Sequence, residues 1–107
     1  MTKEEIRAKC EERYPVAAMQ FWITLEQMYD TFCQKQLDYG PGAIQQDTDE
    51  MTLMGLWFRK NDKLNRLKTC VIEGNLYLAP EALQDTYLDL ANYSIIAKLV
   101  SEGKWGK

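Results

Sequence analysis

Apolar side chains recur at helical spacing in four successive segments of the chain, and each segment predicts one helix. The first helix is short: it opens on a capping box made by Thr2 and Glu5 and runs to about Arg13. Pro15 stops this helix and is well placed to start a second one, which runs to about Leu37. The apolar face of the second helix comprises Ala18, Phe21, Trp22, Leu25, Met28, Tyr29 and Phe32.

A loop and a third helix follow. Residues 38–50 contain a Gly-Pro-Gly sequence and no helical period, so they predict a loop. Thr52 is the expected cap of the third helix, which runs to about Ile72 and ends at Gly74 and Asn75. The side chains expected to be buried on this helix are Leu53, Leu56, Trp57, Leu64, Leu67 and Val71.

A fourth helix opens at Pro80 and runs to about Val100, which leaves residues 101–107 as a C-terminal tail. Each helix carries an apolar stripe that must pack on another helix. We therefore predict an all-α, four-helix bundle-like single domain over residues 1–107, with a short N-terminal helix and three long ones. Aromatic residues make up 11% of the chain, and two helices have 20 or more residues, so we also expect a homo-oligomer.

Charge and composition narrow the classes of partner. The net charge is -3, with 13 basic against 16 acidic side chains, which disfavours polymeric nucleic acid as a partner. A small anionic ligand remains compatible with this charge, because a few local basic side chains can outweigh a mildly acidic net charge. Histidine is absent, which excludes His-dependent nucleophilic, metal and phosphohydrolase centres.

The cysteines and the hydropathy pattern indicate a cytoplasmic protein. Cys10, Cys33 and Cys70 are odd in number and widely spaced, which is typical of reduced thiols rather than of a zinc site or a disulfide framework. No apolar run approaches the roughly 20 residues that span a bilayer, and the polar start does not resemble a signal peptide. We expect no membrane partner.

The fourth helix carries a polar stripe on an otherwise largely apolar surface. Asp85, Asp89 and Asn92 fall within an arc of about 60°. Carboxylates removed from water need partners. These can be Mg²⁺ shared with substrate phosphates, cations of the third helix, or the amino and hydroxyl groups of a base and ribose. The structural alternative is an interhelical ion-pair network that fixes the helix register.

Two other clusters carry candidate chemistry. On the third helix, Arg59, Asp62, Lys63 and Arg66 suit a phosphate clamp, and a solvated salt-bridge ladder is the plain alternative. Where the second helix ends, Lys35 can meet a phosphate and Tyr39 can stack on a base, with Asp38 between them. The alternative there is an ordinary helix terminus followed by a Gly-Pro-Gly turn.

A second pair of acids repeats the spacing of Asp85 and Asp89. Glu26 and Asp30 lie four residues apart at the border of the second helix's apolar face. A solvated edge is the simpler interpretation of this pair. If it converges with Asp85 and Asp89, the four carboxylates become candidate ligands for two metal ions.

Three sequence blocks together resemble the nucleotide modification associated domain family of small phage and bacterial proteins. The blocks are KQLDYG at 35–40, GLWFRKNDKLNR at 55–66 and DTYLDLANY at 85–93. The resemblance covers about residues 15–107 and implies an all-α fold, a phage-related origin and a link to nucleotide metabolism. The chain is also distantly similar to all-α NTP pyrophosphatases of the MazG type. Their metal-binding acids are spaced by three, whereas the pairs here are spaced by four.

Three functional hypotheses follow. We favour a phage-type protein that binds a nucleotide or nucleotide-derived signal without turnover and so antagonises host defence in the host cytoplasm. Under this hypothesis Lys35, Arg59, Lys63 and Arg66 take phosphates, Tyr39, Trp57 and Tyr93 stack, and Asp85, Asp89 and Asn92 read the base or ribose. The second hypothesis is a Mg²⁺-dependent nucleotide pyrophosphohydrolase, with the carboxylates as metal ligands. The third is a helical protein-interaction module.

Overall fold

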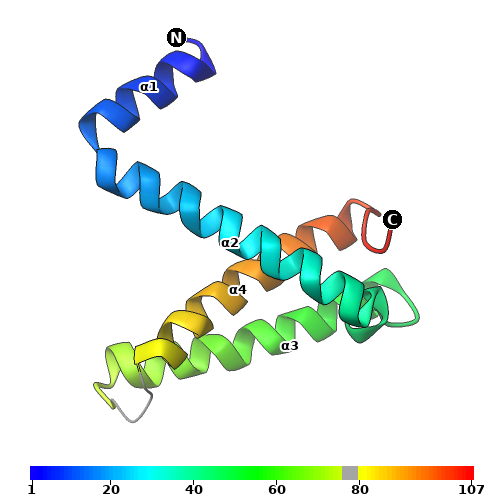
Figure 1. Ribbon diagram of the computed structural model, residues 1–107. Helices are drawn as coiled ribbons and strands as arrows, with labels where there is room; N and C mark the ends of the chain where they lie inside the picture. The colour runs from blue at the N-terminus through cyan, green and yellow to red at the C-terminus, as the bar shows by residue number, and fades with distance from the viewer. Residues whose placement is uncertain (76–79) are drawn as a thin grey trace. The chain divides into compact units, whose positions relative to one another are not determined.

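The computed structural model describes residues 1–75 and 80–107, and within these ranges every regular element is helical (Figure 1). The prediction of an all-α fold with a short N-terminal helix and three long ones is confirmed. In chain order the elements are α1 (Lys3–Arg13), α2 (Pro15–Tyr39), the 3₁₀ turn η1 (Pro41–Ala43), α3 (Asp49–Leu67), the π-helical turn η2 (Lys68–Ile72) and α4 (Pro80–Ser101).

The chain forms two compact units, Met1–Gln34 and Lys35–Lys107. Helix α2 begins in the first unit and ends in the second. The prediction of one domain over residues 1–107 concerns how these units associate, and it stays a prediction.

In the first unit, local signals set the helix ends. Thr2 Oγ1 accepts a hydrogen bond from the backbone N–H of Glu5 at 3.1 Å, and Glu5 accepts one from the Thr2 N–H, which completes the predicted capping box. Tyr14 caps the C-terminus of α1 through its N–H, which donates to the Cys10 carbonyl. Pro15 is then the first residue of α2, where its missing N–H costs nothing.

The apolar face of α2 is largely exposed in this unit. Met28 is buried, but Phe21, Trp22 and Tyr29 each keep about two-thirds of their surface exposed. The Tyr29 ring stacks near Phe32, with 6.4 Å between the ring centroids. The first unit therefore presents large aromatic side chains to its surroundings.

In the second unit, α3 packs against α4 as an antiparallel hairpin (Figure 1). Leu56 and Val100 are at most 2% exposed, and Cys70 is also buried. The buried polar side chains are Thr52 and Thr86; each hydroxyl donates to the carbonyl four residues earlier, Thr48 and Ala82 respectively.

The buried face predicted for the third helix was too wide. Trp57, Leu64 and Val71 are all more than half exposed, whereas Leu56 is almost fully buried. Within the second unit the partner helix of α3 is α4. One antiparallel partner covers only a narrow seam, so apolar positions away from that seam stay at the surface.

The third helix also starts earlier than predicted. Thr48 is its N-cap and accepts a hydrogen bond from the Met51 N–H at 3.1 Å, so Thr52 lies in the first turn instead. Asp49 and Glu50 then occupy the first turn, where negative charge is favourable. At the other end the predicted stop is confirmed, because the π-turn η2 closes before Gly74, which adopts a positive φ of 71°.

The segment predicted as a tail is folded back. Gly103 and Lys104 donate to the carbonyls of Val100 and Leu99, which forms a Schellman cap on α4. The Trp105 indole Nε1 then donates to the Pro41 carbonyl at 3.3 Å, which ties the C-terminal residues to η1. Among the described residues, no helix is both long and apolar enough to cross a membrane.

Candidate ligand-binding site

Two cross-helix contacts join the polar clusters that the sequence placed on α3 and α4. Lys63 Nζ lies 3.0 Å from Asp89 Oδ2. One turn away on each helix, the Arg59 guanidinium lies over the Tyr93 ring, with 5.8 Å between Cζ and the ring centroid. These clusters therefore meet along the edge of the α3–α4 seam.

Arg59, on α3, is held by contacts with two other elements. Besides the ring of Tyr93 on α4, it reaches η1, where its Nη2 donates to the Ala43 carbonyl at 3.1 Å. The residue nevertheless stays exposed. A guanidinium carries five N–H donors in a fixed plane, and the Ala43 bond leaves most of them available. Arg59 is thus a positioned cation that can still pair with an anion.

Lys63 is the ion-pair partner of Asp89. The side chains of Lys63 and Asp89 are 18% and 35% exposed, so the pair is half-buried rather than fully solvated. Of the partners that the sequence left open, the structure provides a cation of the neighbouring helix. The same geometry also fits the structural alternative, in which the pair fixes the register of the hairpin.

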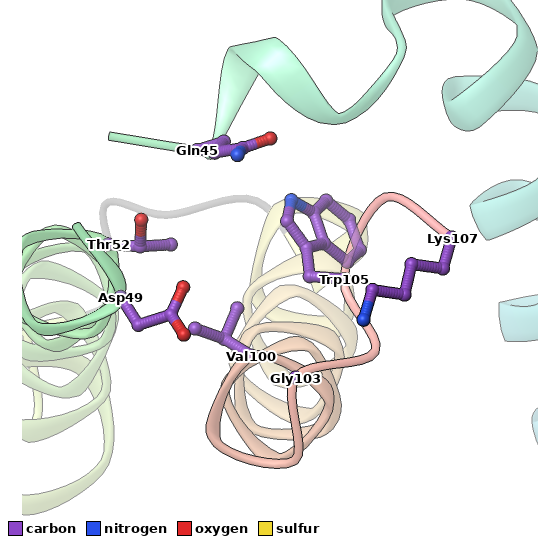
Figure 2. A pocket seen from close by; sticks show the side chains of 7 residues that line it. All are labelled: Gln45, Asp49, Thr52, Val100, Gly103, Trp105 and Lys107. Carbon is purple, nitrogen blue, oxygen red and sulfur yellow. The ribbon is translucent and has the colours of Figure 1, made fainter. Parts of the chain in front are cut away.

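A pocket of about 260 Å³ opens at the end of the hairpin where α3 begins and α4 ends (Figure 2). Its lining comprises Gln45, Asp49, Thr52, Val100, Gly103, Trp105 and Lys107. Figure 2 shows the Trp105 ring between Gln45 and Lys107, with the Asp49 carboxylate across from them. The bond from Trp105 to Pro41 holds the ring in this wall. The pocket thus combines one flat aromatic surface with amide, hydroxyl and charged groups.

This pocket and Arg59 lie on one stripe of the hairpin. Thr52 and Arg59 are seven residues apart on α3, which is two helical turns, so they share a side of the helix. Val100 and Tyr93 have the same separation on α4. At 1.5 Å per residue the separation along the axis is about 10 Å. An elongated small molecule can therefore contact both places.

The remaining site residues predicted on this hairpin divide by helix face. Asp62 and Arg66 are exposed on the same side of α3 as Arg59. On α4, Asp85 is exposed and Asn92 half-buried on the side that carries Asp89. Trp57 lies nearly opposite Arg59 around α3 and packs its ring edge-on to Phe58 instead. Trp57 is therefore separated from the other residues by the helix itself.

The cluster at the end of α2 has the geometry of a helix terminus. Lys35, Asp38 and Tyr39 are exposed there, with Tyr39 69% exposed. Gly40 ends the helix at a φ of 66°, and its N–H donates to the Gln36 carbonyl. This arrangement corresponds to the structural alternative for the cluster, and its role with a ligand stays a prediction.

The hypothesis of a metal site requires that several carboxylates lie close together. Within residues 1–75 and 80–107, no three or more Asp, Glu or Cys side chains are grouped closely enough to share a metal ion. Glu26 and Asp30 are exposed on the part of α2 that belongs to the first unit, as expected for a solvated edge. Asp89 is paired with Lys63.

Sequence reasoning missed the pocket. Its aromatic wall comes from a segment taken for a tail, and the carbonyl that holds Trp105 lies 64 residues earlier in the chain. The available signal was a tryptophan flanked by Gly103 and Gly106, both at positive φ, a pattern that suits a tight turn. No local pattern predicts that this turn docks on η1.

Comparison of the chain with models of known protein families, with curated proteins and with solved structures finds no match.

Proposed function

We propose that this protein binds a nucleotide or nucleotide-derived signal along the α3–α4 stripe and holds it without turning it over. The observation that carries the proposal is the alignment of the Trp105 pocket with the cations Arg59 and Lys63. The pocket lies about two turns from Arg59 on the same side of the hairpin, a spacing comparable with the length of a nucleotide.

The two ends of this stripe suit the two ends of such a ligand. The Trp105 ring offers a stacking surface for a base, and the exposed Gln45 amide offers a donor and an acceptor for its edge. At the other end, Arg59 is positioned by Ala43 and Tyr93 and retains free donors for a phosphate. Preorganised donors lose less entropy on binding than mobile ones.

The pairing of Asp89 favours capture over turnover. Lys63 Nζ lies 3.0 Å from Asp89 Oδ2, so a metal ion at Asp89 has to compete with the ammonium group for this carboxylate. In the proposed complex Lys63 adds positive charge one turn beyond Arg59, and Asp89 remains its ion-pair partner. The resemblance of the three sequence blocks to a nucleotide-linked phage family favours the same ligand class. In that setting the protein sequesters a host defence signal in the host cytoplasm.

A binding panel tests the proposal. We expect isothermal titration and thermal shift, with mono-, di-, tri- and cyclic nucleotides, to show binding that persists without Mg²⁺. Chromatography should recover the bound nucleotide unchanged. If every nucleotide leaves both signals at baseline, the proposal is wrong. Phosphate or pyrophosphate release that EDTA abolishes favours the pyrophosphohydrolase instead.

Two substitutions locate the site. Arg59→Ala should weaken nucleotide binding about 10- to 100-fold, the expected cost of one lost charge-assisted contact. Lys68→Ala is the matched control, because it removes one exposed positive charge from the opposite side of the same helical segment. Trp105→Ala should also weaken binding. If Arg59→Ala lowers only the melting temperature and leaves affinity unchanged, the contact with Tyr93 is structural.

A further inference from the structure

The first unit contains a large groove that the proposed function does not use. Helices α1 and α2 meet at Tyr14 and form an elbow (Figure 1). A groove of about 790 Å³ lies between them, and its apolar lining includes Ile6, Tyr14, Phe21, Trp22 and Leu25. All of its lining residues belong to the first unit.

The apolar surface in this groove has the size of a dimer interface. Tyr14, Phe21 and Trp22 are 58%, 69% and 66% exposed. Since one aromatic side chain carries roughly 150–250 Å², the three rings offer roughly 300–500 Å². Ile6 and Leu25 add to this. A standard interface takes about 800 Å² from each partner, of which somewhat over half, about 450–520 Å², is apolar.

The groove carries one basic and one acidic side chain, so the same patch on two copies can be complementary in charge. Arg7 and Glu11 both line it and lie one turn apart on α1. Neither side chain forms an ion pair with another described residue. In a two-fold interface the same patch meets itself, so residue i of one copy contacts residue j of the other and the reverse. Under that symmetry, a basic and an acidic side chain that form no ion pair within one copy can pair across the two-fold axis.

We propose that this groove is the interface of a homodimer, filled by the α1–α2 elbow of a second copy. The aromatic side chains Phe21 and Trp22 of each copy pack into the groove of the other. Arg7 of each copy pairs with Glu11 of the other. A second copy fits this surface better than a strongly acidic or basic partner does, because the groove carries one charge of each sign.

Sedimentation velocity of the full chain measures its oligomeric state directly. A reducing agent is present throughout so that Cys10, which also lines the groove, cannot cross-link two copies. We expect a species of twice 12.5 kDa at micromolar concentrations. A chain that sediments as a monomer up to hundreds of micromolar overturns the proposal; it is the result expected if the first unit packs on its own chain or awaits a different partner.

A matched pair of variants assigns the interface. Phe21→Glu places a charge in the groove and should raise the dimer Kd at least about tenfold. Met19→Glu is the control, because Met19 is 63% exposed on the same helix but does not line the groove. Equal effects of the two substitutions, or a dimer that Phe21→Glu leaves intact, place the interface elsewhere and overturn the proposal.

A charge exchange tests the symmetry. Arg7→Glu and Glu11→Arg should each weaken the dimer, because like charges then face each other across the interface. The double variant R7E/E11R exchanges the two signs and should restore dimerisation to within a few-fold of the native Kd. If the dimer Kd of the double variant rises by the product of the two single-variant increases, the two residues do not pair across a two-fold axis. That result overturns the proposal.

Discussion

Lys63 on α3 and Asp89 on α4 form an ion pair of 3.0 Å, with the Lys63 side chain 18% and the Asp89 side chain 35% exposed. One turn along each helix, Arg59 lies over Tyr93. A shift of one helix by one residue rotates these positions by about 100° and separates both pairs at once. The two contacts therefore specify the register of a hairpin whose apolar seam is narrow.

The Lys63–Asp89 pair should contribute measurably to stability. In a double-mutant cycle with Lys63→Met and Asp89→Asn, we expect a coupling of about 0.5–1 kcal/mol in urea denaturation, decreasing at high salt. Lys98 and Glu102, paired at 2.9 Å with the lysine 72% exposed, provide the control. That pair should couple more weakly, because solvent screens it. Additive effects of the Lys63 and Asp89 substitutions contradict the prediction.

Leu56 should be the most sensitive leucine of α3. It is 1% exposed, and Leu56→Ala should lower the free energy of unfolding by about 2–4 kcal/mol, because the lost burial leaves a cavity in the seam. Leu64→Ala makes the same change on the same helix at a position that is 52% exposed, so it should cost less than about 1 kcal/mol. Chemical denaturation of both variants compares them. Similar costs contradict the described packing.

Docking of the C-terminal segment should depend on Gly106. This residue has a φ of 79°, and an added Cβ lies 3.3 Å from two Pro41 carbon atoms. Gly106→Ala should therefore destabilise the docked segment by about 1 kcal/mol, measured as faster amide hydrogen exchange in residues 102–107. Gly42→Ala should leave that exchange unchanged, since Gly42 has no positive φ and its added Cβ meets nothing within 4 Å.

Glu102 should titrate below its ordinary range. Its pKa is lowered from 4.5, mainly because its carboxylate accepts a hydrogen bond from Lys98, with Lys104 as a second nearby cation. Because the folded pKa is depressed, this contribution is present above pH 4.5 and is lost as pH falls through the folded value. Side-chain NMR titration measures the pKa of Glu102. A pKa of 4.5 or higher contradicts the pairing, and Lys98→Met should move the pKa back toward 4.5.

The helices themselves could be predicted because their signals are local. The Thr2–Glu5 capping box, Pro15 at the start of α2 and Gly74 after η2 act on the backbone within a few residues. Where two local signals competed, prediction was wrong by one turn: Thr48 and Thr52 are both good caps, and the acids at 49 and 50 favour the earlier one.

The sequence by itself determined the helical class, most helix ends and a polar stripe on α4 that had to find partners, because periodicity and capping depend on neighbours along the chain. Only the tertiary structure decided that Lys63 is the partner of Asp89 and that Trp105 closes a pocket against η1. Those contacts join residues 26 to 64 positions apart. They depend on how α3 packs against α4, which no local pattern encodes.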